Sequence, residues 1–168
     1  MERLKEALSA AGIAYKENEP LCAHCTFRIG GPADLFVLPE NEEQLCAAIR
    51  LAKEAGVRSY LLGNGSNLLF EDAGYRGAVI NVSAMKSGIG VIENISFPGK
   101  DPALTYDAVV VGAGQMLSSL CMAALENSLT GLEFAYGIPG TVGGAVYMNA
   151  GAYGGEMKDV LASVRYLT

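Results

Sequence analysis

Positive charge is scarce in this chain of 168 residues. Twelve Lys and Arg stand against eighteen Asp and Glu, which gives a formal net charge of −6 at pH 7, and the basic residues form no cluster. Because nucleic-acid binding depends on clustered Lys and Arg that release counterions from phosphates, this composition argues against a nucleic acid as partner. No Lys or Arg at all occurs between Asp101 and Met157. An anionic ligand held by that stretch must therefore be bound by main-chain N–H groups.

Long hydrophobic runs are also lacking. No apolar run reaches the roughly 18 residues of a membrane span, and the first ten residues, MERLKEALSA, form a charged helical pattern rather than a signal peptide. We therefore expect a cytoplasmic protein with no membrane partner. With 51% hydrophobic and 18% charged residues, the chain has enough apolar side chains to bury a substantial core.

Metal ligands are few. Cys22 and Cys25 flank His24 in a CxxC pattern, but no second CxxC or HxxxH supplies the remaining ligands of a structural zinc site. Cys46 and Cys121 lie on the apolar faces of predicted helices, where a reduced thiol acts as a small hydrophobic residue. We predict no metal site.

Glycine, in contrast, is abundant and concentrated. Eight of the 21 glycines fall between Gly131 and Gly155, in the stretch GLEFAYGIPGTVGGAVYMNAGAYGG. Their neighbours are apolar residues and tyrosines rather than Ser or Gln, which is not the composition of a flexible linker. A dense glycine cluster in apolar surroundings indicates positive φ angles or a close approach of the backbone to a ligand. We interpret this glycine-rich segment as a main-chain surface for a nucleotide cofactor.

The periodicity of apolar residues predicts both helices and strands. Helices are predicted over residues 2–11, 40–56 and 115–128. Asn41 and Gln44 form a capping-box pattern at the second helix, Gly56 ends it, and Leu125 is placed on the buried side of the third. Strands are predicted at residues 35–38, 59–62 (buried), 78–82, 89–92 and 109–111. Residues 89–108 resemble a hairpin with a polar, proline-containing loop, and the alternation in DVLASVRYLT predicts the first half of another strand.

Two shorter glycine turns follow predicted strands, GNGSN at residues 63–67 and GAG at residues 112–114. A turn of small residues with asparagine amides can cradle phosphates, and an ordinary Asn-Gly hairpin is the alternative for residues 63–67. The second turn also resembles the start of a GxGxxG fingerprint, although Leu117 stands where the third glycine belongs. Three backbone cradles suit an extended dinucleotide such as FAD. The alternative is that all three glycine segments are merely tight turns that bind no ligand.

Four stretches together resemble the UDP-N-acetylenolpyruvoylglucosamine reductase (MurB) family, flavoenzymes of peptidoglycan precursor synthesis. They are TFRIGGPADLFVLPENEEQL, YLLGNGSNLLF, VVVGAG and GLEFAYGIPGTVGGAVYMNAGAYGGE. The resemblance implies an α+β FAD-binding fold of the vanillyl-alcohol-oxidase (PCMH) type, with a small α/β subdomain at residues 1–75 and a second α+β subdomain at residues 76–168. It also implies FAD as cofactor, NADPH as reductant, and reduction of UDP-N-acetylglucosamine enolpyruvate to UDP-N-acetylmuramate.

Motif matching to this family implies cofactor-binding residues in all three glycine segments. The pyrophosphate would lie on Gly63, Asn64, Gly65, Ser66 and Asn67, supported by Gly112, Ala113 and Gly114. The ribityl chain and ring would lie against Ile138, Pro139, Gly140, Val142, Gly143, Gly144, Asn149, Gly151, Ala152 and Tyr153. Whether Arg28 and Tyr136 contact the ligand stays open.

The catalytic residues of the family have no counterpart in this chain. The Tyr-Arg-x-Ser motif, the serine general acid and the C-terminal glutamate are not matched, since Arg165 precedes Tyr166 and does not fit the motif. The chain also has about half the family's length. We therefore expect the FAD-binding part of the enzyme, inactive alone, with the UDP-sugar bound by a missing C-terminal domain. A stand-alone flavin- or nucleotide-binding module without catalysis is the alternative.

Overall fold

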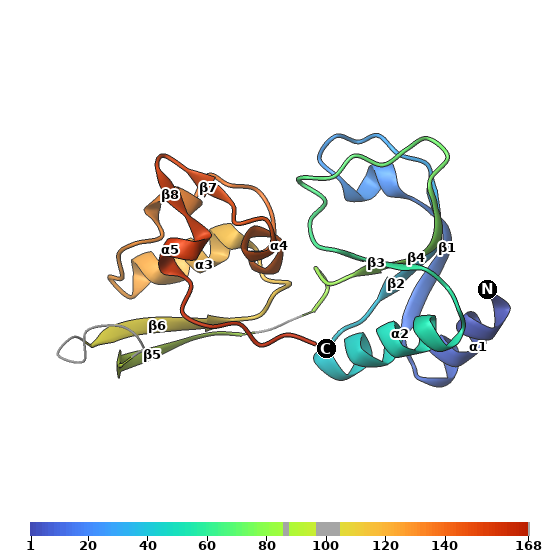
Figure 1. Cartoon of the computed structure of the whole chain (residues 1–168), viewed down its shortest axis with the longest axis horizontal. Coiled ribbons are helices and arrows are strands. Elements are labelled where there is room, and N and C mark those ends of the chain that lie inside the picture. The colour runs from blue at the N-terminus through green and yellow to red at the C-terminus, as the bar shows by residue number, and fades with distance from the viewer. Residues whose placement is uncertain (86–87, 97–104, 168) are drawn as a thin grey trace. The chain divides into compact units, whose positions relative to one another are not determined.

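The computed structural model describes residues 1–85, 88–96 and 105–167, and the chain divides into two units, residues 1–86 and 87–168 (Figure 1). The sequence placed a boundary between residues 75 and 76. In the structure, strand β4 (Tyr75–Asn81) belongs to the first unit, because it is hydrogen-bonded on both sides within that unit's sheet. The division therefore falls after β4 rather than before it.

The first unit is built on a four-stranded sheet with the strand order β1-β2-β4-β3. Strand β1 (Ala14–Pro20) is antiparallel to β2 (Pro32–Leu38), whereas β2 and β3 (Ser59–Leu62) both run parallel to β4. The predicted strand at residues 59–62 thus forms, but its buried character is wrong: it lies at the sheet edge and three of its four residues are exposed. Because β3 pairs in parallel with β4, residues 63–67 do not form the Asn-Gly hairpin turn that was the alternative.

Alternate residues of β2 and β4 bury opposite faces of this sheet. Helices α1 (Glu2–Ala10) and α2 (Glu42–Glu54) cover one face, where Leu4 and Leu8 pack with Leu35, Val37, Ala48, Ala52, Ala78 and Ile80. The short 3-10 helix η1 (Leu21–His24) and neighbouring loops cover the other face, over Phe36, Leu62 and Val79 (Figure 1). Each buried aliphatic side chain contributes about 2 kcal/mol to the stability of the fold. The helices on one face and η1 with its loops on the other are therefore held against the sheet.

The predicted caps of α2 are confirmed with one change. The Asn41 side chain accepts a hydrogen bond from the Gln44 N–H at 2.9 Å, but the Gln44 side chain accepts from the N–H of Glu40, one residue before the cap. Gly56 follows the helix end with a φ of 66°. Cap and stop therefore hold the helix within the predicted range.

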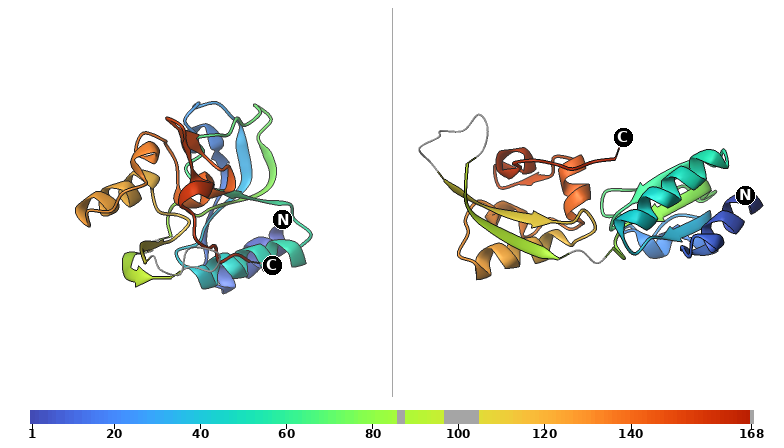
Figure 2. Two further views of the ribbon diagram at one scale, coloured as in Figure 1. Left: turned by 60° about the vertical axis from the view of Figure 1, so that its left-hand side comes forward. Right: turned by 90° about the horizontal axis from the view of Figure 1, so that it is seen from below.

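The second unit begins with the antiparallel hairpin of β5 (Ile89–Ile95) and β6 (Tyr106–Val111), as predicted. Most of the predicted proline-containing loop lies outside the described residues. Helix α3 (Leu117–Glu126) follows β6 and lies along the hairpin (Figures 1 and 2). Because β6 pairs antiparallel with β5, strand, GAG turn and helix do not form a parallel βαβ unit, and the GxGxxG alternative is wrong.

The rest of the second unit consists of short elements. They are η2 (Glu133–Ala135), α4 (Val142–Tyr147), β7 (Gly151–Ala152), β8 (Gly155–Glu156) and α5 (Met157–Val160). Their core joins Leu117, Leu120 and Cys121 of α3 to Val142, Ala145 and Met157. Burial raises the pKa of the Cys121 thiol, as expected for a cysteine used as a hydrophobic residue.

Two predictions for the second unit are wrong. Leu125 is 68% exposed, because it follows buried Ala124 by one residue and so points about 100° away from it around α3. Residues 161–167 form no strand: α5 ends at Val160, and the exposed residues after it have no ladder partner in the described part of the chain. Across the described residues, every helix is too short or too polar to cross a membrane.

Candidate functional site

A pocket of about 470 Å³ lies at the carboxyl ends of β3 and β4 in the first unit. Gly63 and Asn64 follow β3 directly, and Asn81 ends β4. Ligands of parallel sheets bind at this edge, where the connecting loops leave the strands. The pocket is lined by Ala23, His24, Cys25, Thr26, Arg28, Gly63, Asn64, Asn81 and Ser83.

The GNGSN loop at residues 63–67 is fixed to its surroundings through its carbonyl oxygens. Buried Asn81, 7% exposed, donates a hydrogen bond from Nδ2 to the Gly63 oxygen at 3.0 Å and accepts one from the Ser83 N–H. Thr26 donates from its N–H to the Gly65 oxygen and from Oγ1 to the Ser66 oxygen. The loop conformation is thus set by residues outside it.

Gly65 is required at the centre of this loop. Its φ is 63°, a left-handed conformation that favours glycine. A β-carbon added there would overlap the carbonyl oxygen of His24 and lie 2.9 Å from Cα of Cys25. Both the backbone angle and the contact with η1 therefore exclude a side chain.

Three main-chain donors of the same loop have no described partner. Within the described residues, the N–H groups of Asn64, Gly65 and Asn67 donate no hydrogen bond. Successive main-chain N–H groups that have no partner within the protein are the donors that bind phosphate oxygens. The loop therefore fits the diphosphate of a dinucleotide.

His24 makes contacts within the first unit. The His24 ring stacks on Phe36 at a centroid distance of 4.0 Å, and its Nε2 lies 2.8 Å from Oε1 of Glu19. Hydrogen bonds from Lys16 first and His24 second hold the pKa of Glu19 below its ordinary value. In the described parts of the chain, no three His, Cys, Asp or Glu side chains gather into a metal-binding group.

In the second unit, the GAG turn packs directly against the start of α4. The Gly143 N–H donates to the Ala113 oxygen at 2.9 Å, and the Val142 N–H donates to the Gln115 oxygen at 2.8 Å. A β-carbon on Gly143 would lie 2.7 Å from Cβ of Ala113, so this contact requires glycine. The structure thus brings together two of the three predicted glycine segments.

These contacts occupy several N–H groups that were expected to face a ligand. Besides Val142 and Gly143, the Gly144 N–H is bonded, to Oγ1 of buried Thr141, which caps α4. By contrast, the N–H groups of Ala113 and Gly114 donate to no described residue. In this unit, the GAG turn rather than the start of α4 therefore has N–H groups without a described partner.

The segment from Asn149 to Tyr153 forms a braced loop and a tight turn. Asn149 has a φ of 47°, and its side chain donates to Oε2 of Glu156 at 2.7 Å and accepts from the Lys158 N–H at 2.9 Å. Tyr153 and Gly154, both with positive φ, join β7 to β8 in the manner of a two-residue hairpin turn. Asn149 is thus committed to the loop, while Tyr153, 96% exposed, stands at its tip.

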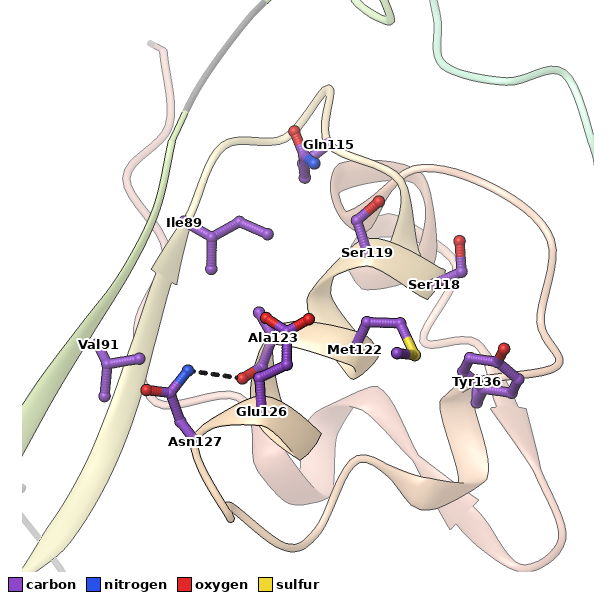
Figure 3. A pocket seen from close by; sticks show the side chains of 10 residues that line it. All are labelled: Ile89, Val91, Gln115, Ser118, Ser119, Met122, Ala123, Glu126, Asn127 and Tyr136. Atoms are coloured by element: carbon purple, nitrogen blue, oxygen red, sulfur yellow. Dashed lines mark hydrogen bonds between the residues drawn. The ribbon is translucent and has the colours of Figure 1, made fainter.

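A second pocket, of about 690 Å³, lies between β5 and α3 (Figure 3). It is lined by Ile89, Val91, Gln115, Ser118, Ser119, Met122, Ala123, Glu126, Asn127 and Tyr136. None of the predicted cofactor-binding residues is among them. Sequence reasoning missed this pocket because it is formed by the solvent-facing side of an amphipathic helix, and the paired serines Ser118 and Ser119 were the only signal.

The sequence prediction identified only part of the lining of the first pocket. Of the predicted residues, Gly63 and Asn64 line it, whereas Gly65, Ser66 and Asn67 do not. The missed residues come from η1 and the loop after it, and from the end of β4. No spacing rule relates these segments, which only the sheet brings together.

The chain belongs to a family of FAD binding domains, whose family model matches residues 33–168. Among flavoproteins of known structure, it shares its fold with a VAO-type flavoprotein from Myceliophthora thermophila, at a TM-score of 0.50 and 19% identity, over 61% of this chain and 18% of that one. The predicted fold class is therefore confirmed.

More specifically, the chain is similar to UDP-N-acetylenolpyruvoylglucosamine reductases. The enzyme from Alkaliphilus oremlandii is 46% identical over 89% of this chain and 45% of the relative, and that from Lachnoclostridium phytofermentans is 44% identical over 100% and 51%. The crystal structure of the Thermus caldophilus enzyme matches with a TM-score of 0.59 and 32% identity, over 88% of this chain and 46% of that one. The chain spans about half the length of the curated relatives it matches.

Proposed function

We propose that this chain is the FAD-binding part of a UDP-N-acetylenolpyruvoylglucosamine reductase. The whole enzyme would reduce UDP-N-acetylglucosamine enolpyruvate to UDP-N-acetylmuramate with NADPH, in the cytoplasm, during peptidoglycan precursor synthesis. The observation that carries the proposal is the GNGSN loop, whose carbonyls are bonded within the protein while three of its N–H groups have no described partner. Identities of 44% and 46% to reductases of that name support the choice of enzyme.

The proposal assigns FAD to main-chain surfaces of both units. The diphosphate would lie on residues 63–67, with the N–H groups of Ala113 and Gly114 as further donors. Contacts to the ribityl chain and ring are proposed for Ile138, Pro139, Gly140, Val142, Gly143, Gly144, Asn149, Gly151, Ala152 and Tyr153. FAD supplies hydride transfer when bound, and the protein binds and orients it. The remaining half of the relatives' length would supply the catalytic residues and the UDP-sugar site.

A chimera tests the assignment of activity. This chain is joined to the remaining half of a curated relative, FAD is added, and NADPH oxidation is followed with UDP-N-acetylglucosamine enolpyruvate. We expect turnover by the chimera and none by the 168-residue chain, although both bind FAD. A folded chimera that binds FAD but never oxidises NADPH would favour a stand-alone flavin-binding module.

A further inference from the structure

We infer that Arg28 supplies the cationic contact to the diphosphate in the pocket of the first unit. The inference rests on the proposed function, because it concerns the ligand of the same site. It adds a side-chain charge to a site that the glycine segments alone would build from main-chain donors. Three observations support it: the place of Arg28, the absence of a competing ion pair, and its backbone conformation.

Arg28 lines the same pocket as the start of the GNGSN loop. It shares this lining with Gly63, Asn64 and Asn81, at the carboxyl ends of β3 and β4. The N–H group of Asn64 is a neutral donor without a described partner at this pocket, and a guanidinium provides charged donors with a planar fork that matches phosphate oxygens. The two kinds of donor together suit a diphosphate, which carries several negative oxygens.

The charge of Arg28 is not neutralised elsewhere. Arg28 is the only Lys or Arg among the pocket-lining residues. In the described ranges, the guanidinium of Arg28 forms no salt bridge, whereas Arg76 is paired with Asp34. Arg28 therefore keeps its full charge for a ligand in a protein of net charge −6.

The backbone holds Arg28 in a rarely populated conformation. Its φ is 54°, in the left-handed region that non-glycine residues seldom adopt. The turn is closed by a hydrogen bond from the Arg28 N–H to the Cys25 oxygen at 3.2 Å. Residues kept in such conformations gather at ligand clamps, where the surrounding structure imposes a side-chain direction.

The test compares ligands that do and do not contain the diphosphate. Affinities for FAD, ADP and riboflavin are measured by calorimetry for the wild-type chain, Arg28→Ala, Arg28→Lys and the control Arg50→Ala. Arg50 is exposed on α2, which covers the opposite face of the sheet. We expect Arg28→Ala to weaken FAD and ADP roughly 10-fold or more, as for loss of a charge-assisted contact. Riboflavin should change less than about twofold in this variant, and Arg50→Ala should match wild type.

The remaining comparisons separate the effect of the Arg28 charge from a structural effect of the substitution. Arg28→Lys keeps the charge without the fork and should recover part of the affinity for ADP. Unchanged FAD and ADP affinities in Arg28→Ala would overturn the inference and leave the proposed function standing. Equal weakening of riboflavin would assign Arg28 a structural role and also overturn it. If the folded wild-type chain binds neither FAD nor ADP, the proposed function fails, and the inference with it.

Discussion

At the scale of single residues, Asn81 has the clearest role in shaping the site. Its side chain links the end of β4 to the first carbonyl of the GNGSN loop and to the N–H of Ser83. Asn81 is almost fully buried, so both hydrogen bonds are made by a side chain that is held in the interior. The orientation of the loop therefore depends on a residue that lies 14 positions beyond its end in the sequence.

Replacing Asn81 with alanine should destabilise the first unit and weaken FAD binding. Two hydrogen bonds of the Asn81 side chain are lost, and at about 0.5–1.5 kcal/mol each this costs about 1–3 kcal/mol in the free energy of unfolding. Urea denaturation of the variant measures this loss. The matched control is Asn67→Ala, an exposed asparagine in the same loop, which should change stability by less than about 0.5 kcal/mol. Equal stabilities of the two variants would contradict the role of Asn81.

The carboxylate of Glu156 gives a prediction about pH. Hydrogen bonds from Lys158 first and Asn149 second hold its pKa below the ordinary glutamate value. A lowered pKa in the folded state stabilises the fold above the ordinary value, and this contribution is lost as the pH falls through the folded-state pKa. The loop braced by Asn149 should thus loosen only under acidic conditions.

Titration of the Glu156 carboxyl carbon by NMR measures this pKa directly. We expect a midpoint below the ordinary glutamate value in the wild-type chain and a higher midpoint in Lys158→Ala. A Glu156 midpoint at or above the ordinary value would show that the bracing contacts do not persist in solution.

At the scale of elements, the first pocket depends on close contact between η1 and the GNGSN loop. Gly65 makes that contact possible, and Gly12 offers a comparison at the end of α1. The two glycines have φ angles of 63° and 66°, but a β-carbon on Gly12 would meet nothing within 4 Å. An alanine would therefore have similar backbone strain at both positions, and the two positions differ only in packing.

Gly65→Ala should cost clearly more stability than Gly12→Ala. The left-handed conformation alone costs an alanine about 1–2 kcal/mol, and overlap with η1 at Gly65 adds about 1–3 kcal/mol. Thermal and urea denaturation of both variants measure the difference. Similar losses would mean that η1 and the loop move apart easily, which the structure does not predict.

The helices and strands also show which features of the fold could be predicted from the sequence. Helix α2 was predictable because its cap, apolar face and glycine stop lie within one short stretch of sequence, residues 41–56. The exposure of β3 was not, because its four-residue apolar run does not reveal a position at the sheet edge. Likewise, the use of the Val142, Gly143 and Gly144 N–H groups depends on the GAG turn and on the Thr141 cap, which only the folded unit brings together.

At the scale of the whole molecule, the glycine content is explained largely by packing within each unit. Gly65 and Gly143 are needed for contacts with His24 and Ala113, and glycine at position 154 completes a hairpin turn. The sequence correctly indicated where the backbone is closely approached, but the neighbour is often the protein itself. Each unit has one glycine turn with N–H groups that lack a described partner, the GNGSN loop in the first unit and the GAG turn in the second.

Calorimetric titration of FAD into the folded 168-residue chain tests the central claim most directly. If the GNGSN loop binds the diphosphate of the dinucleotide, FAD should bind with a stoichiometry of about one per chain, and ADP should compete for the site. The chain should also retain visible flavin absorbance after desalting if binding is tight. A folded chain that takes up no FAD at saturating concentration would contradict the account.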